Sequence, residues 1–215
     1  NVKLLLSYDD IGSYDKVFIS KVFTDTFVPD EVLKLSWVEY GGTGFFYDKA
    51  EPLPYEIEHS MPDYHLYDEW VNEMLNDGIT NGYTEEEKKK LVQSRRKDFV
   101  YYLDYSIGFL TRGCIRGCSF CVNQNYKQCL RHSHVEEFMD KDRKYLCFLD
   151  DNFLSCKEWK SIIEEVKATG KRFQFKQGLD ERLLTDEKIK EVFSWNYIGD
   201  YIFAFDNIED KKIIE

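Results

Sequence analysis

Three cysteines lie close together in the sequence, at Cys114, Cys118 and Cys121, with the spacing C-x3-C-x2-C. Thiolates are soft ligands that suit zinc and iron–sulfur clusters. A four-iron cluster normally takes four cysteine ligands, so three cysteines would bind three irons and leave the fourth open to another ligand. Gly113 and Gly117 favour a backbone that curls around a cluster, because glycine has no Cβ. The segment therefore predicts an iron–sulfur site with one open iron.

Other uses of these cysteines stay open at this point. A structural zinc ion takes four Cys or His ligands, and Cys129, His132 or His134 would complete such a set. Zinc ligands usually come as pairs separated by a longer stretch, however, rather than as a compact triplet. The alternative to an enzyme is thus a non-catalytic module that holds zinc or an electron-transfer cluster. A disulfide framework is a further possibility, but six cysteines in 215 residues fit a reducing compartment better.

The motif resembles the cluster loop of the radical S-adenosylmethionine (SAM) superfamily, in which an aromatic residue precedes the last cysteine, as Phe120 does here. The resemblance implies that Cys114, Cys118 and Cys121 bind a [4Fe-4S] cluster, that SAM binds the open iron, and that Phe120 packs near the adenine. It implies reductive cleavage of SAM to methionine and a 5′-deoxyadenosyl radical, which takes hydrogen from a substrate that the sequence does not identify. An electron donor such as a flavodoxin or a ferredoxin is the implied partner.

The elements that must position this loop repeat in the order strand, loop, helix from residue 105 onwards. Apolar runs predict strands over 106–110, 145–149, 172–177 and 201–206. Amphipathic segments predict helices over 157–168 and 185–195. Such units build a parallel sheet with its active site at the carboxyl ends of the strands. With the resemblance, residues 105–215 are predicted to form a partial TIM-like barrel of about four strands, and we expect the native chain to be longer.

Acidic residues follow the second of these predicted strands, at Asp150 and Asp151. A carboxylate there suits the ammonium group of SAM, because a hydrogen bond between opposite charges is strong. The alternative is that Asp151 or Asn152 caps the next helix.

Further polar residues follow the third and fourth predicted strands. Gln177 and the run 178–182 are expected to face the same site, and Asp206 would accept a hydrogen bond from a ribose hydroxyl or cap a helix. Phe120, Asp150, Asp151, Gln177 and Asp206 form the predicted cofactor-binding set. No catalytic residue is assigned.

Residues 1–55 are predicted to form a small Rossmann-like α/β module, with strands over 2–6, 16–20 and 36–40 and a helix over 29–35. The module resembles the cobalamin-binding-like domain that precedes the barrel in one branch of the superfamily, and we expect it to be incomplete. The D-x-H-x-x-G motif of the cobalamin-binding version is missing, and the nearest match, around His65, lacks the glycine. Cobalamin is therefore not expected.

Residues 56–104 are predicted to form a linker with a helical insert. Thr84 and Glu87 have the spacing of a helix-capping box, and Ser133 and Glu136 repeat that spacing later in the chain.

Composition limits the class of protein. No apolar run approaches the ~18 residues of a membrane span, and the apolar start of the chain is too short for a signal peptide, so we expect a cytoplasmic protein. The net charge of −11 disfavours nucleic acid as a partner, because such binding relies on cations that neutralise phosphates.

Overall fold

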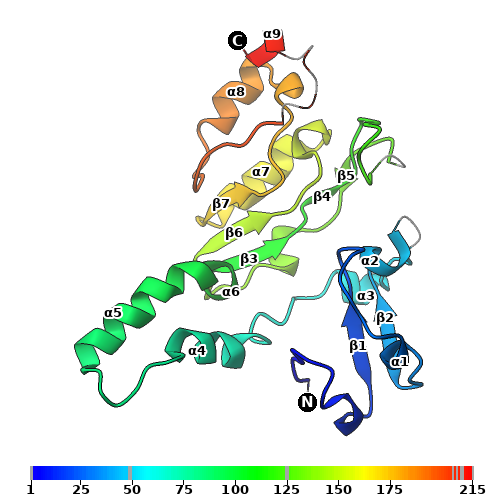
Figure 1. Ribbon diagram of the computed structural model, residues 1–215. Coiled ribbons are helices and arrows are strands. Elements are labelled where there is room, and N and C mark those ends of the chain that lie inside the picture. Colours follow the sequence, from blue (N-terminus) through cyan, green and yellow to red (C-terminus); the bar gives the residue numbers. More distant parts are fainter. Residues whose placement is uncertain are drawn as a thin grey trace. The chain divides into compact units, whose positions relative to one another are not determined.

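The computed structural model describes residues 2–47, 50–123, 126–204, 206, 208 and 211–214. The chain divides into two compact units, residues 1–58 and 59–215, and each contains a small parallel sheet next to helices (Figure 1). The fold is mixed α/β, and the strands of the described ranges do not close into a barrel. Within those ranges, no helix combines the length and the apolar character needed to span a bilayer.

The first unit is built on two parallel strands, β1 (Val17–Ser20) and β2 (Val38–Gly41). A parallel pair needs a crossover connection, and helix α1 (Asp30–Leu33) lies on it, as the βαβ pattern predicts. Short helices η1 (Ile11–Ser13), α2 (Thr43–Phe46) and α3 (Tyr55–Glu58) complete the unit.

The strand predicted over 2–6 does not form. A strand needs a neighbour for its backbone hydrogen bonds, and residues 2–6 pair with no strand in the described part of the chain. Leu5 instead packs against the small core formed by Val17, Val32 and Val38. Hydrophobicity alone had suggested a buried strand, whereas the segment contributes a single anchoring side chain.

The second unit opens with a helical segment. It contains α4 (Asp68–Asn76), α5 (Glu85–Arg96), the 3₁₀ helix η3 (Lys97–Phe99) and α6 (Val100–Asp104). The capping box predicted at the start of α5 is confirmed: the Glu87 backbone N–H donates to the Thr84 hydroxyl, and the Thr84 N–H donates to the Glu87 carboxylate.

The second predicted capping box is displaced by one residue. The 3₁₀ helix η4 (Val135–Glu137) begins after His134, whose backbone N–H donates to the Glu137 carboxylate at 3.0 Å. The Ser133 hydroxyl lies 2.9 Å from His132 Nδ1 instead, which explains why Ser133 does not act as the cap.

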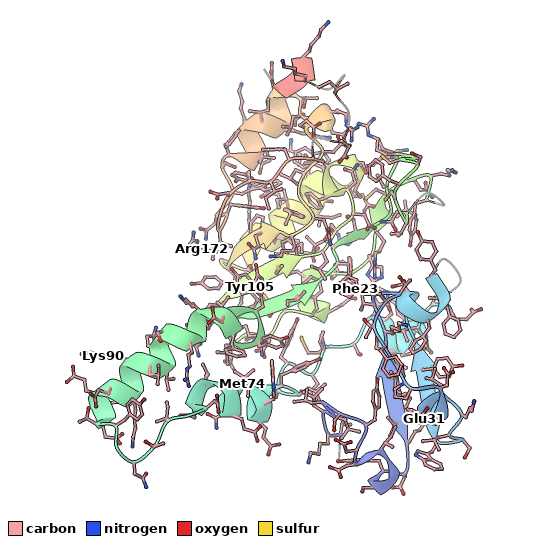
Figure 2. The ribbon with its side chains drawn as sticks, viewed as in Figure 1. Phe23, Glu31, Met74, Lys90, Tyr105 and Arg172 are labelled. Atoms are coloured by element: carbon pink, nitrogen blue, oxygen red, sulfur yellow. The ribbon has the colours of Figure 1, made fainter. Side chains whose placement is uncertain are left out.

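The sheet of the second unit has the strand order β3-β6-β7 and is parallel throughout. Its strands are β3 (Tyr105–Gly108), β6 (Tyr145–Phe148) and β7 (Arg172–Phe175). They begin at aligned residues, and Figure 2 shows Tyr105 and Arg172 near the same edge of the sheet. Because the register is even, the carboxyl ends at Gly108, Phe148 and Phe175 meet at the opposite edge.

Helix α7 (Trp159–Ala168) covers one face of this sheet. The apolar stripe predicted for this helix is buried, and alternate strand residues pack against it. Tyr105 and Cys147, which point to the other face of the sheet, are also buried. The main contributors to this core are Trp159, Ile162, Ile163, Val166, Leu146, Phe148, Phe173 and Phe175. The core fixes the sheet edge from which the polar strand-end residues project.

The strand predicted over 201–206 is not formed in the described residues, and Phe205 lies outside them. Isolated parallel bridges join Tyr197 to Phe173 and Phe203 to Leu179. Gly199 lies between them with φ of +79°, a left-handed backbone that interrupts an extended run. Helices α8 (Asp186–Val192) and α9 (Lys211–Ile214) flank this segment.

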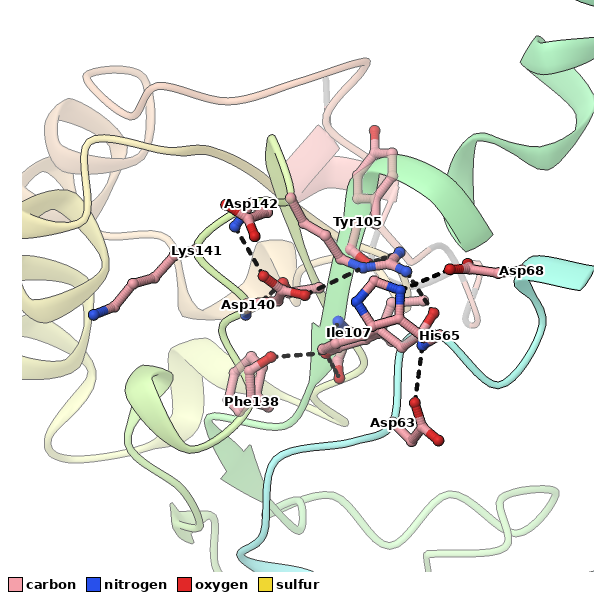
Figure 3. A network of polar contacts seen from close by, with 12 residues as sticks. Asp63, His65, Asp68, Tyr105, Ile107, Phe138, Asp140, Lys141 and Asp142 are labelled. Atoms are coloured by element: carbon pink, nitrogen blue, oxygen red, sulfur yellow. Dashed lines mark hydrogen bonds and ion pairs between the residues drawn. The ribbon is translucent and has the colours of Figure 1, made fainter. Parts of the chain in front are cut away.

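The outer edge of β3 is covered by the segment around Tyr64. The Tyr64 hydroxyl accepts from the Ile107 N–H at 2.8 Å and donates to the Phe138 carbonyl at 2.7 Å (Figure 3). The Arg143 guanidinium donates to the carbonyls of Tyr64 and Tyr105. These bonds satisfy backbone groups that an edge strand would otherwise leave exposed.

His65 follows in the same segment and is exposed. Its Nδ1 lies 2.7 Å from the Asp68 carboxylate, and this hydrogen bond raises the pKa of His65 (Figure 3).

Candidate functional site

The three closely spaced cysteines lie on a loop between two short antiparallel strands, β4 (Thr111–Arg112) and β5 (Leu130–Arg131). Cys114, Cys118 and Cys121 are half-buried free thiols. The sequence predicted that the loop would follow the first strand of the sheet directly. The hairpin that carries it was missed, because strands of two residues leave almost no hydrophobic pattern.

Glycine is required at one of the two predicted positions. Gly113 has φ of +94°, and a Cβ there would lie 2.4 Å from the Gln128 carbonyl oxygen. At Gly117 a Cβ would meet no protein atom within 4 Å, so the protein's own packing does not require glycine there. The tight turn is thus at the entrance to the cysteine loop.

Asp150 fixes the start of the hairpin. Its carboxylate is buried and accepts hydrogen bonds from the Leu110 N–H at 3.1 Å and from the N–H and hydroxyl of Thr111, both at 2.6 Å. Burial raises the pKa of Asp150 to about 6, although these hydrogen bonds act in the opposite direction. Asp150 therefore lies beside the predicted site, and each of its oxygens accepts at least one hydrogen bond from the protein.

Asp151 joins the two sides of the loop. One carboxylate oxygen accepts from the Gly113 N–H at 2.9 Å, just before the first cysteine. The other accepts from the Asn123 side-chain amide at 2.7 Å, two residues after Cys121. The side chain thus spans the loop entrance and exit, and it helps to bring the outer cysteines to the sheet edge.

Asn152 and Asp180 contact the first cysteine and its neighbours. The Asn152 amide donates to Cys114 Sγ at 3.4 Å and to an Asp180 oxygen at 3.0 Å. The same Asp180 oxygen accepts from Arg116 Nε at 2.9 Å, and the other accepts from Arg182 Nε at 2.7 Å. Burial opposes ionisation of Asp180, but the hydrogen bonds from Arg182, Arg116 and Asn152 outweigh it and lower its pKa.

The backbone also directs N–H groups at the sulfurs. The Arg116 N–H donates to Cys114 Sγ at 3.3 Å, and the Asn123 N–H donates to Cys121 Sγ at 3.4 Å. Such hydrogen bonds stabilise negative charge on sulfur, which is the form that binds metals. The loop's own backbone thus supplies a donor to the first and to the third of the three sulfurs.

Three of the predicted cofactor-binding residues lie away from these contacts. Phe120 is 70% exposed, and Gln177 and Asp206 are exposed as well. The structure thus gathers Asp150 and Asp151 around the cysteine loop and leaves the other three at the surface.

Sequence reasoning missed part of the network around the cysteines. Asn152 precedes the 3₁₀ helix η5 (Phe153–Ser155) but makes no side-chain cap bond, because its amide faces Cys114 and Asp180. Asp180, which precedes η6 (Glu181–Leu183), was included only within the run 178–182. The signal for both was present: each lies a few residues beyond a predicted strand, where side chains from neighbouring parallel strands converge.

Cys129 does not belong to this group of cysteines. It is 4% exposed, lies in the hydrophobic core with Cys156, and has its pKa raised to about 11 by burial. A buried thiol with a raised pKa is a poor metal ligand.

The donor set fits an iron–sulfur cluster in its chemistry. It offers three free thiols on one loop and backbone and amide N–H groups directed at two of the sulfurs. Within the ranges that the structure describes, no three His, Cys, Asp or Glu side chains come close enough to hold a single metal ion.

Comparison of the chain with family models, curated proteins and solved structures finds no match.

Proposed function

We propose that the chain carries the cofactor site of a radical SAM enzyme, with Cys114, Cys118 and Cys121 as the three protein ligands of a [4Fe-4S] cluster. The observation that carries the proposal is the arrangement of the cysteine loop. Its three thiols are free, two of the sulfurs receive N–H donors, and strand-end side chains hold the loop at the carboxyl edge of a parallel sheet. Parallel α/β sheets place ligand sites at this edge.

When bound, the cluster would supply the electron that cleaves SAM and yields the 5′-deoxyadenosyl radical. The protein binds and orients the cofactors and keeps the site closed to competing reactions. In this division of roles, the cysteines hold three irons, Asp151 closes the loop, and Asp150 fixes the strand that leads into it.

Two buried side chains offer acceptors for the ammonium group of SAM. Among the described residues, Asn152 Oδ1 and both carboxylate oxygens of Glu181 are buried without a hydrogen-bond partner. Unpaired buried acceptors are unfavourable unless a donor reaches them. We therefore add Asn152 and Glu181 to Asp150 and Asp151 as acceptors proposed for the ammonium group. Arg182 Nε lies 4.0 Å from Glu181 Oε1, so this carboxylate already has a cation beside it.

The wider setting follows from the same proposal. The strands β3, β6 and β7 would belong to a partial barrel of the radical SAM type, and the first unit to a cobalamin-binding-like module. A flavodoxin or ferredoxin would donate the electron, and the six free thiols support a reducing, cytoplasmic setting. The substrate is not assigned, and the net charge of −11 does not favour a nucleic acid.

The test is anaerobic reconstitution with iron and sulfide, followed by reduction with dithionite in the presence of SAM. We expect about four irons per chain and the formation of 5′-deoxyadenosine. Stoichiometric zinc in place of iron would overturn the proposal, and an iron–sulfur cluster without SAM cleavage would favour the electron-transfer alternative.

The variant Cys118→Ala should abolish stable cluster binding, because it removes one of three ligands. Its matched control is Cys147→Ala, since Cys147 is a buried thiol on β6 outside the loop. Normal iron content in Cys118→Ala would show that the ligands are misassigned.

A further inference from the structure

The Asn152 side chain lies between a cysteine sulfur and a carboxylate. Its amide nitrogen is 3.4 Å from Cys114 Sγ and 3.0 Å from Asp180 Oδ2, and the residue is 5% exposed. An amide has two N–H groups, so it can donate to both partners at once. This geometry uses both donors and leaves the amide oxygen facing away from the sulfur.

Asp180 determines which way the Asn152 amide points. A carboxylate accepts hydrogen bonds and cannot donate them when ionised, so the NH₂ group rather than the oxygen must face it. Asp180 is held in turn by Arg116 on the cysteine loop and by Arg182 on η6. The orientation of one amide is therefore fixed from two sides of the site.

Two donors converge on the Cys114 sulfur from different parts of the chain. The Arg116 backbone N–H approaches from within the loop at 3.3 Å, and the Asn152 amide approaches from the end of β6. The donor from the loop moves with the cysteine. The donor from the sheet edge is independent of the loop and can hold the sulfur in place.

We propose that Asn152 is a positioning residue for Cys114, which directs an N–H group at the ligand sulfur while Asp180 fixes the direction of its amide. The proposal rests on the iron–sulfur function proposed above. Hydrogen bonds to the sulfurs of a cluster stabilise its more negative, reduced form and raise its reduction potential. Asn152 therefore sets how readily the cluster accepts an electron, in addition to fixing the position of one ligand.

The experiment is a redox titration of the reconstituted full chain, followed by electron paramagnetic resonance, in the native protein and Asn152→Leu. Leucine has nearly the same shape but no donor. At a fixed solution potential, we expect the ratio of reduced to oxidised cluster to fall about tenfold in the variant, which is a shift of about 59 mV for one electron.

The matched control is Asn123→Leu. The Asn123 amide also bonds a carboxylate next to the loop, that of Asp151, but it directs only its backbone N–H at a sulfur, and the substitution keeps that group. We expect its potential to stay close to that of the native protein. An equal shift in both variants would mean that any loosening of the loop changes the potential, and would overturn the specific role of Asn152.

A double variant separates packing from the donor to sulfur. In Asn152→Asp with Asp180→Asn, a carboxylate and an amide again face each other, but the side chain at position 152 no longer directs an N–H group at Cys114. We expect this variant to bind the cluster and its reduction potential to stay as low as that of Asn152→Leu. A native potential in the double variant, or in Asn152→Leu, would overturn the proposal.

Two further outcomes are decisive. If Asn152→Leu assembles no cluster while Asn123→Leu does, Asp180→Asn replaces Asn152→Leu in the titration. In Asp180→Asn the Asn152 amide loses its anionic partner. It can then turn its oxygen toward the sulfur, which lowers the reduction potential. An unchanged potential in Asp180→Asn then overturns the proposal. If the native chain binds zinc or no iron, the iron–sulfur function itself fails. If the native chain binds the cluster and substitution of Asn152 leaves the reduction potential unchanged, only the role of Asn152 is refuted.

Discussion

Replacing Asp151 by alanine should open the cysteine loop. The carboxylate accepts from the Gly113 N–H at 2.9 Å and from the Asn123 amide at 2.7 Å, on opposite sides of the three cysteines. A hydrogen bond to a charged group contributes roughly 1.5–3 kcal/mol, and the lower value suits a half-buried side chain. Losing two such bonds should therefore weaken loop closure by about 3 kcal/mol.

That free energy has a measurable consequence without any metal. Each 1.36 kcal/mol corresponds to a factor of ten, so 3 kcal/mol corresponds to a factor of about a hundred in the population of the open loop. The Gly113 amide loses its acceptor in Asp151→Ala, and its hydrogen exchange should become faster by up to that factor. The same variant should lose iron faster to a competing chelator after reconstitution.

Asp151→Asn serves as the matched variant, because it keeps one oxygen that can accept a hydrogen bond and should fall between the native protein and the alanine variant. Asp142→Ala, at an exposed position outside the loop, should change neither measurement. Native exchange at the Gly113 amide in Asp151→Ala would refute the reasoning, because it would mean that the loop is held by contacts other than this carboxylate.

Two further predictions concern the sheet and its edge. The pKa of Asp150 is about 6 in the folded chain against 3.8 for an unperturbed carboxyl group, so the folded chain binds more protons between these values. Stability therefore falls by about 2 kcal/mol as the pH rises from 4 to 6. Urea denaturation across this range should show that the unfolding free energy of Asp150→Asn lacks this fall with pH; an equal fall in both proteins would contradict a raised pKa for Asp150. Tyr64→Phe leaves the Ile107 N–H without its partner and should lower the free energy of unfolding by about 1–3 kcal/mol, measured in urea. Tyr67→Phe, on the same segment but with an exposed ring, is its control and should be near neutral.

The regular elements could be predicted from the sequence where one side of an element is buried. Helix α7 and strands β6 and β7 carry apolar residues at the right period, since each packs one face into the same core. The strands predicted over 2–6 and 201–206 had the right composition but lacked a continuous partner in the described residues. Strand formation depends on a neighbour as well as on hydrophobicity, and the sequence does not state which neighbour is available.

For the candidate site as well, some residues could be predicted from the sequence and others could not. The cysteines, Asp150 and Asp151 could be found because their residue types and their places after strands are visible in the sequence. Their partners could not, because a side chain such as Asp180 reaches Arg116 across 64 positions, and no local pattern records that distance. The hydrogen bonds that Asp150 accepts from Leu110 and Thr111 were likewise not visible in the sequence, because these residues lie about 40 positions away.

The consecutive residues Asp150, Asp151 and Asn152 contact three successive parts of the hairpin: the strand that leads in, the two ends of the loop, and the first cysteine itself. They follow β6, the central strand, whose position is fixed by pairing on both sides and by the core beneath it. A loop with little secondary structure of its own is thus anchored by residues that follow β6, the strand that is paired on both sides. For the iron–sulfur cluster that we propose, this placement would limit the movement of the ligands when the cluster accepts an electron.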